Sequence, residues 1–267
     1  MIVLQPYALP DPGIAVEFLQ QTMEGRERLF VQIVGASKEM RTSQNGARYL
    51  YARFSLLEYM SAAYALKNRE TFDASADILV AQPLPDEFEW FRPTAAQRGD
   101  DLAVAISCRR SERSRDIAKQ ILRGEAGPAP EDLQAHILAR LTDLDYGTVA
   151  RLVARLRDAI SAAGLRKHDV LLLSAWANAA EHVATRSDEG LSAELQKIMQ
   201  LRSVHVAKLL TRWHKGQNVD LTAIDFWDRH TTALIVLAAG VDCGIDLTPA
   251  DMPFADGRWT EGVHEWA

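Results

Sequence analysis

The sequence has few cysteines and no long apolar run. Its two cysteines, Cys108 and Cys243, form no CxxC pair, which excludes a cysteine-rich zinc site and favours a reducing compartment. No apolar run approaches the roughly 18 residues that a membrane span requires. The first residues also lack the basic leader and the small-residue cleavage site of a secretory signal. We therefore expect a cytoplasmic protein that does not associate with membranes.

Motifs for nucleotides, metals and nucleophilic catalysis are missing as well. The sequence contains no GxGxxG or GxxxxGK[ST] loop and no HExxH or HxH pair, and no GxSxG or SxxK motif stands in a recognisable setting. We therefore expect no cofactor and no metal. If an enzymatic site exists, it must be assembled from residues distant in the sequence, and the best candidates are His182, Asp228 and His230.

The net charge of −6 lies almost entirely at the C-terminal end. From Asp242 onwards the chain has six acidic residues, and Arg258 is the single basic residue among them. The rest of the chain is nearly neutral, so its overall acidity does not exclude an anionic partner.

Hydrophobic patterning predicts an α+β fold that is predominantly helical. Glycine and proline interrupt the pattern between Gly124 and Pro130. We expect a small mixed α/β region over residues 1–125, a helical bundle over 130–248 and an acidic tail with aromatic side chains over 249–267. In the bundle, helices are expected near 131–143, 147–163, 168–186, 190–215 and 220–241.

Three short apolar runs in the first region have the length and composition of buried strands. They are Leu29–Val34, Asp77–Ala81 and Leu102–Cys108. Between the first two runs, residues Ala47–Leu66 are predicted to form a helix, since apolar residues recur along one face at three- and four-residue steps. The predicted face comprises Leu50, Phe54, Leu57, Ser61 and Tyr64.

The segment Leu138–Leu156, LARLTDLDYGTVARLVARL, resembles the helix-turn-helix of MarR-like and other winged transcription regulators. The resemblance implies that Arg151 and Arg155 face outward toward nucleic acid, and Asp145 is expected to cap the second helix. The residues that follow are helical in pattern, whereas a wing requires a β-hairpin. Two antiparallel helices of a bundle therefore remain the alternative.

Two further groups of basic residues could bind an anion. Arg109, Arg110 and Arg113 follow the last predicted strand, next to a helix that we expect Ser111 to cap. A second group recurs at helical spacing near 190–215 and could follow a phosphate backbone or an acidic protein surface. Its members are Arg202, Lys208, Arg212 and Lys215.

These features predict a non-catalytic interaction or scaffold protein, one subunit of a larger assembly. Its cationic helix faces would bind a protein partner. Trp259 and Trp266 of the tail either pack back on the bundle or engage another subunit, where aromatic side chains supply concentrated binding energy. The first alternative is a nucleic-acid-binding protein that uses the segment 138–156 and the basic groups. The second alternative is an enzyme with a dispersed site.

Overall fold

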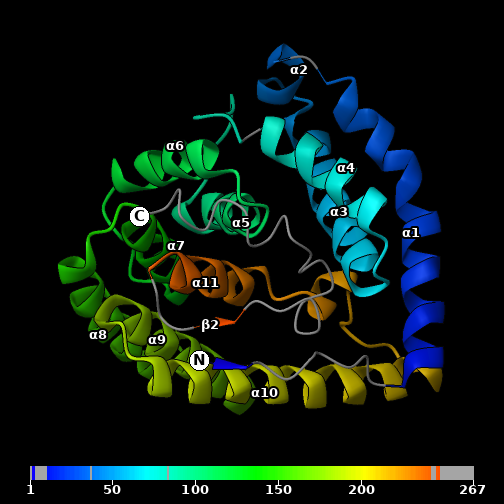
Figure 1. The fold of residues 1–267 in the computed structure, drawn as a ribbon. Coiled ribbons are helices and arrows are strands. Elements are labelled where there is room, and N and C mark those ends of the chain that lie inside the picture. Colours follow the sequence, from blue (N-terminus) through cyan, green and yellow to red (C-terminus); the bar gives the residue numbers. More distant parts are fainter. Residues whose placement is uncertain (1, 4–10, 37, 83, 242–244, 247–267) are drawn as a thin grey trace. The chain divides into compact units, whose positions relative to one another are not determined.

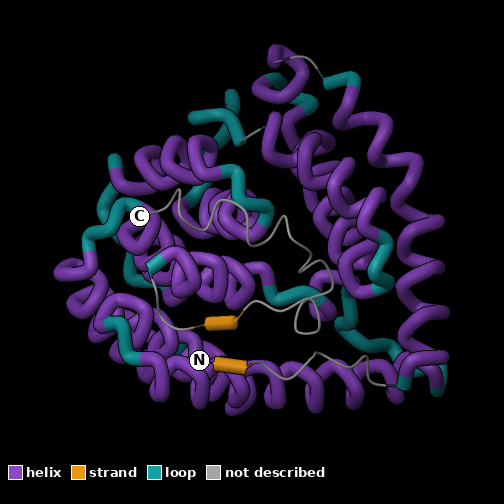
Figure 2. The backbone as a smooth tube through the Cα atoms, in the orientation of Figure 1, coloured by secondary structure: helices purple, strands orange, loops and turns teal. Residues whose placement is uncertain are grey.

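The computed structural model describes residues 2–3, 11–36, 38–82, 84–241 and 245–246. Helices account for almost all of the regular secondary structure in this part of the chain (Figures 1 and 2). The predicted tail, with Trp259 and Trp266, lies outside the described residues.

The chain divides into two compact units. Unit 1 comprises Met1–Tyr7, Thr94–Arg202 and Arg229–Ala267, and unit 2 comprises Ala8–Pro93 and Ser203–Asp228. The Gly124–Pro130 connection lies within unit 1.

Unit 1 contains helices α5 to α9, part of α10, and α11. A glycine allows its two central helices, α5 and α7, to approach closely: a Cβ atom on Gly99 would lie 2.6 Å from the Cβ of Ala135. The helix bounds are α5 (Ala95–Ser107), α6 (Ser111–Leu122), α7 (Pro130–Thr142), α8 (Tyr146–Ala162), α9 (Lys167–Thr185), α10 (Asp188–His214) and α11 (Arg229–Gly240).

Unit 2 is built from α1, α2, α3, α4, the last part of α10 and a short 3-10 helix, η1. Its core includes Leu19 of α1, Ala62 of α3 and Leu210 of α10. Phe18 adds edge contact with Trp213, the ring centroids being 5.1 Å apart. The bounds are α1 (Pro12–Val34), α2 (Lys38–Thr42), α3 (Gly46–Ala65), α4 (Arg69–Ala81) and η1 (Ala223–Phe226).

The predicted mixed α/β region is wrong, because all three expected strands are helical. Leu29–Val34 ends α1, Asp77–Ala81 ends α4, and Leu102–Cys108 forms the end and C-cap of α5. A short apolar run has the same composition in a buried helix as in a buried strand, so the pattern alone could not separate them. Among the described residues, the extended pairing is limited to two residues each of β1 (Ile2–Val3) and β2 (Ile245–Asp246).

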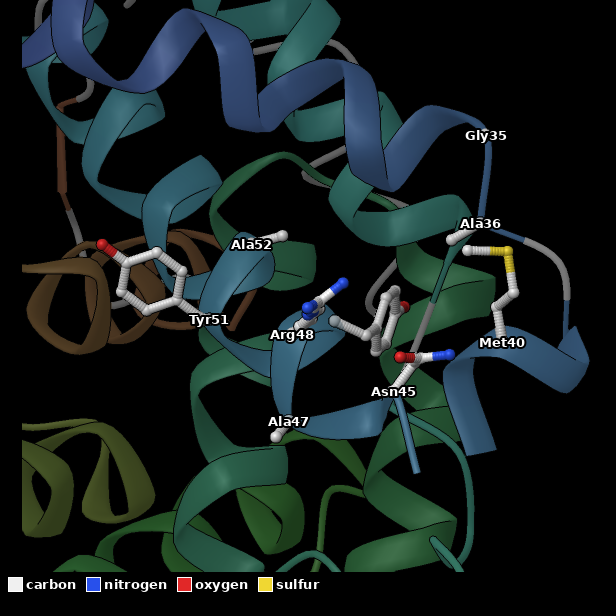
Figure 3. A pocket seen from close by; sticks show the side chains of 9 residues that line it. Gly35, Ala36, Met40, Asn45, Ala47, Arg48, Tyr51 and Ala52 are labelled. Carbon is white, nitrogen blue, oxygen red and sulfur yellow. The ribbon is translucent and has the colours of Figure 1, made fainter. Parts of the chain in front are cut away.

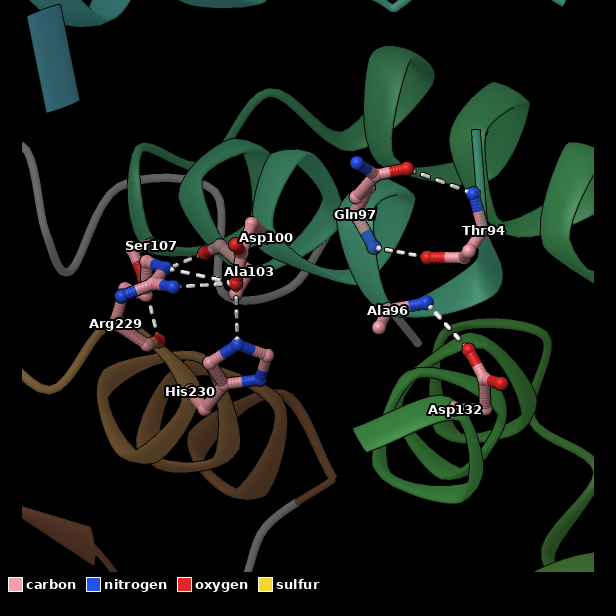
Figure 4. A network of polar contacts seen from close by, with 9 residues as sticks. All are labelled: Thr94, Ala96, Gln97, Asp100, Ala103, Ser107, Asp132, Arg229 and His230. Atoms are coloured by element: carbon pink, nitrogen blue, oxygen red, sulfur yellow. Dashed lines mark hydrogen bonds and ion pairs between the residues drawn. The ribbon is translucent and has the colours of Figure 1, made fainter. Parts of the chain in front are cut away.

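Capping favours the helical alternative at α5. Thr94 and Gln97 form a reciprocal capping box at its start. Asp132 of α7 accepts a further hydrogen bond from the backbone N–H of Ala96, at 2.9 Å (Figure 4). These contacts satisfy the first-turn N–H groups that would otherwise lack acceptors.

The helical predictions elsewhere agree closely with the structure. Ala47–Leu66 corresponds to α3, and the first four helices expected after residue 130 correspond to α7, α8, α9 and α10. The fifth expected segment, 220–241, is divided into η1 and α11 by Trp227, which has an extended backbone, and Asp228.

Candidate binding site

A cavity of about 770 Å³ lies in unit 2 beside the first half of α3. This volume falls within the roughly 300–1,000 Å³ typical of ligand pockets. We call it the α3 cavity, and Figure 3 shows Met40 of α2 near Ala36 and Asn45, with Arg48 and Tyr51 farther along α3. Its lining comprises Gly35, Ala36, Met40, Asn45, Ala47, Arg48, Tyr49, Tyr51 and Ala52.

Large apolar side chains are exposed around this cavity. Met40 and Tyr51 line it and are 50% and 55% exposed; Val34 precedes the lining residue Gly35, and Phe54 lies one helical turn after Tyr51. Together they are half of the strongly exposed large apolar residues in the described part of the chain. We call Val34, Met40, Tyr51 and Phe54 the apolar rim. Aromatic residues and methionine are enriched in protein interfaces, so the composition of the rim is that of a binding surface.

Arginine side chains accompany the tyrosines of the cavity. Arg26 donates a hydrogen bond to the hydroxyl of Tyr51 at 3.2 Å. The guanidinium of Arg41 lies 6.0 Å from the ring centroid of Tyr49, within reach of a cation–π interaction. Arg48 is exposed, and its side chain makes no hydrogen bond or ion pair with any described residue. The cavity therefore presents a cation that is available to an incoming anionic group.

The start of α3 is held in place by contacts from the loop after α4. A Cβ atom on Gly46 would lie 2.6 Å from the ring of Phe88, so only glycine allows this ring to pack there. The hydroxyl of Tyr49 donates to the backbone carbonyl of Gln82 at 3.1 Å, and the guanidinium of Arg53 donates to the same carbonyl. These contacts fix the helix that forms one wall of the cavity.

Glu58 is a buried carboxylate on α3. It forms an ion pair with Arg26 at 2.8 Å. Burial raises its pKa above the usual value; the charge of Arg26 opposes this shift, and Asp225 reinforces it. Arg26 therefore connects this buried acid to Tyr51 at the cavity.

A second polar cluster joins α5 and α11 in unit 1 (Figure 4). Asp100 accepts hydrogen bonds from Arg229 Nε at 3.1 Å and from His230 Nε2 at 2.9 Å. Partial burial of Asp100, whose side chain is 40% exposed, disfavours its charged form, but the charge of Arg229 and both hydrogen bonds outweigh this effect and hold the pKa well below the usual value. Ser107 donates to the carbonyl of Arg229 at 3.3 Å. The cluster therefore joins the first turn of α11 to α5.

The geometry of this cluster is that of a structural contact. The second ring nitrogen of His230, Nδ1, is buried and has no hydrogen-bond partner in the described structure. The hydroxyl of Ser107 is already engaged with backbone carbonyls of Ala103 and Arg229. The hydroxyl of Ser107 is therefore not presented to His230 as an activated nucleophile would be. Of the other proposed catalytic residues, His182 packs its ring against Gly190.

The segment that resembles a helix-turn-helix forms α7, a three-residue turn and α8. The expected cap is confirmed, since the side chain of Asp145 accepts from the backbone N–H of Thr148 at 3.2 Å. Arg151 and Arg155 are both exposed on α8, and Arg155 donates to the carbonyl of Ala126 at 3.0 Å. The next element is the 19-residue helix α9, where a winged regulator would have a β-hairpin.

The basic group after α5 is placed differently from the expectation. The predicted strand before it is part of α5, and the residue at the cap of α6 is Arg110, so the cap expected at Ser111 is wrong. Arg109 lies in the turn with a left-handed backbone (φ 54°), and burial lowers its pKa to about 10. The Nη1 atom of Arg113 lies 3.9 Å from the Oδ2 atom of Asp116, within the range of an ion pair.

The second basic group, on α10 and just after it, falls in both units. Arg202 belongs to unit 1, and Lys208, Arg212 and Lys215 belong to unit 2. The last three are exposed; Arg212 donates to Gln217 at 3.1 Å, and neither lysine forms an ion pair with a described residue. This face is therefore open to solvent.

The sequence did not reveal the α3 cavity. The sequence pattern places Phe54 on the apolar face of its helix, yet its side chain is 47% exposed. The available signal was a spacing: Ala47, Tyr51 and Phe54 recur at four- and three-residue steps, as expected for one side of a helix.

No protein-family model, curated protein or solved structure matches this chain. Within the described ranges, no three or more His, Cys, Asp and Glu side chains are arranged to hold a metal ion. None of the helices in those ranges has both the length and the apolar character to cross a membrane.

Proposed function

We propose that this chain is a non-catalytic interaction protein that binds a protein partner through the α3 cavity and its apolar rim. The observation that carries the proposal is the exposure of Met40, Tyr51 and Phe54 beside an available arginine, Arg48. A cytoplasmic location, predicted from the cysteine content, belongs to the same proposal.

The rim has enough apolar surface to matter energetically. An aromatic side chain can bury about 150–250 Å², and Tyr51 and Phe54 are each about half exposed. Each can therefore lose roughly 100 Å² to a partner, worth about 2.5 kcal/mol at about 25 cal/mol per Å². Association costs offset part of this gain, so we expect that the aromatic pair contributes strongly to binding only when Arg48 is also engaged.

Site-specific photocrosslinking tests the proposal. Two variants of this chain are prepared, one with benzoylphenylalanine in place of Tyr51 and one with benzoylphenylalanine in place of Val204. Val204 is a 65% exposed residue of α10 and serves as the matched control. We expect a single protein to be crosslinked at position 51 and not at position 204. The identified protein, once purified, should bind the wild-type chain saturably.

Substitution of Arg48 then tests whether the protein crosslinked at position 51 binds specifically to the α3 cavity. Arg48→Glu should weaken the affinity for the purified partner about tenfold or more, as expected for a central interface arginine, while Lys208→Glu leaves it unchanged. If both positions capture the same proteins, or if Arg48→Glu has no effect, the α3 cavity is not the binding site.

Nucleic-acid binding is the second candidate, and one observation favours it. Lys208 and Lys215 are exposed and form no ion pair with a described residue, so both are available to phosphates. A fluorescently labelled DNA duplex and an RNA oligonucleotide of mixed sequence serve as probes. Binding through these residues requires an affinity that falls steeply with salt.

A further inference from the structure

We infer that the α3 cavity binds residues 249–267 of a second copy of this chain. The inference rests on the proposed function and names the partner for the same site. The evidence is the complementarity between the cavity and this segment in charge, in apolar character and in length.

The charges of the two surfaces are opposite. Arg41 and Arg48 lie at or beside the cavity, whereas Glu39 is the one acidic residue between residues 34 and 57 of the sequence. The segment 249–267 has four acidic residues, while Arg258 is its only arginine and it contains no lysine. Opposite charge guides association and fixes the orientation of partners. Arg48, which is exposed and has no partner among the described residues, is the cation best placed to receive a carboxylate.

The apolar groups of the two surfaces also correspond. The segment contributes Phe254, Trp259 and Trp266, which are the residue types that dominate binding energy in interfaces. The rim offers Tyr51 and Phe54 as partners, and the cavity of about 770 Å³ can accept an aromatic side chain. Stacked or edge-to-face pairs of rings add to the gain from burial alone.

The lengths are compatible. Along α3, Asn45 and Phe54 are nine residues apart, which corresponds to about 13–14 Å at about 1.5 Å per residue. Phe254 and Trp259 are five residues apart and can be separated by at most about 17–18 Å in an extended chain. Both aromatic residues can therefore contact this stretch of α3 at once, one in the cavity and one against the rim.

If two copies exchange their segments 249–267, the α3 cavity of each copy is occupied. Each copy donates its segment 249–267 and accepts the segment of the other, which closes a two-fold dimer without leaving an open end. Because two contacts then act together, the dimer is more stable than one segment-to-cavity contact would be.

The test uses full-length variants in a complementation experiment. The cavity variant carries Arg48→Glu and Tyr51→Ala, and the segment variant carries Phe254→Ala and Trp259→Ala. The matched control carries Val204→Ala and Lys208→Glu, which change one exposed apolar residue and one exposed cation on α10. Circular dichroism and urea unfolding check that each variant is folded.

Sedimentation velocity provides the measurement. We expect concentration-dependent dimerisation of the wild type and of the control, and at least about a tenfold loss of affinity in the cavity and segment variants. Mixing the two deficient variants should restore a 1:1 complex, because one retains the segment and the other retains the cavity. This complex has one of the two contacts and should therefore be weaker than the wild-type dimer. A defect of folding would not be repaired by mixing.

Three outcomes would overturn the inference. The wild type could remain monomeric at every concentration, as it would if the segment bound within its own copy or not at all. The cavity variant could dimerise like the wild type, or the mixture could fail to associate. If, in any of these cases, the crosslinker at position 51 captures another protein whose binding depends on Arg48, the proposed function stands and only the identity of the partner is wrong.

Discussion

Asp100→Asn is expected to destabilise unit 1 by loosening the contact between α5 and α11. The substitution keeps the shape of the side chain but removes the charge that Arg229 and His230 contact. A hydrogen bond to a charged group contributes about 1.5–3 kcal/mol. The side chain of Asp100 is 40% exposed, so solvent screening reduces this figure. We therefore expect the free energy of unfolding to fall by about 1–2 kcal/mol.

Urea unfolding followed by circular dichroism measures this change, and hydrogen exchange locates it. Faster exchange should appear in α11, since Arg229 and His230 form its first turn. Asp158→Asn is the matched control, because Asp158 is an exposed residue of α8 and surface substitutions of this kind stay within about 0.5 kcal/mol. Equal stability of Asp100→Asn and the wild type at neutral pH would refute the argument.

The pH dependence gives an independent check on the same contact. The folded-state pKa of Asp100 is lowered from 3.8, so its contribution to stability is present above the unfolded pKa and is lost as the pH falls through the folded pKa. The difference in unfolding free energy between the wild type and Asp100→Asn should be constant above about pH 5 and should shrink below about pH 4. A difference that does not change with pH would show that the charge of Asp100 is not responsible.

Three further predictions concern packing, a buried acid and a basic surface. Gly99→Ala should cost about 1–3 kcal/mol, since its Cβ would lie 2.6 Å from the nearest atom of α7, whereas Gly147→Ala meets nothing within 4 Å and should be neutral or stabilising; thermal unfolding compares them. Burial raises the folded-state pKa of Glu58, so stability relative to Glu58→Gln should fall as the pH rises from about 4 to 7; urea unfolding at several pH values would contradict this if the difference grew. If nucleic acid binds to α10, Lys208→Glu with Lys215→Glu should weaken binding and reduce its salt dependence, and fluorescence anisotropy that is unchanged would exclude this face.

The second half of the chain was predictable because its helices are amphipathic. In α8, Val149, Leu152 and Leu156 are buried, while Arg151 and Arg155 are exposed. An apolar stripe at helical spacing is typical of an amphipathic helix that packs one face against a core, and this is how α8 packs. The cap at Asp145 was predictable for the same reason, because the bond it makes is local.

The first part of the chain was not predictable in this way. The end of α5 is buried on all sides, with Leu102, Val104 and Ile106 each at most 1% exposed. A helix without a polar face has no period to detect, and its Val and Ile residues resemble those of a strand. The decisive contact at its start comes from Asp132, which is remote in the sequence, so it could not be predicted from residues 94–108 alone.

The α3 cavity could not be predicted because it depends on which face of a helix receives a neighbour. The sequence pattern places Phe54 and Leu57 on one apolar face, yet Phe54 is 47% exposed and Leu57 is 7% exposed. The spacing of apolar residues predicts the helix, but the packing of α1 against α3 decides how wide its buried stripe is.

The exposure of the basic face and the exposure of the apolar rim have different physical meanings. Lys208 of α10 and Lys215 just after it follow the general rule that charged residues face water, so their exposure is expected even for a helix with no partner. Tyr51 and Phe54 break the corresponding rule for apolar residues, and they do so together, next to a cavity. An exposed apolar group costs solubility, and clusters of this kind mark interaction sites on monomeric proteins. The apolar rim is for this reason stronger evidence for binding than the basic face, although the sequence alone predicted only the basic face as a binding surface.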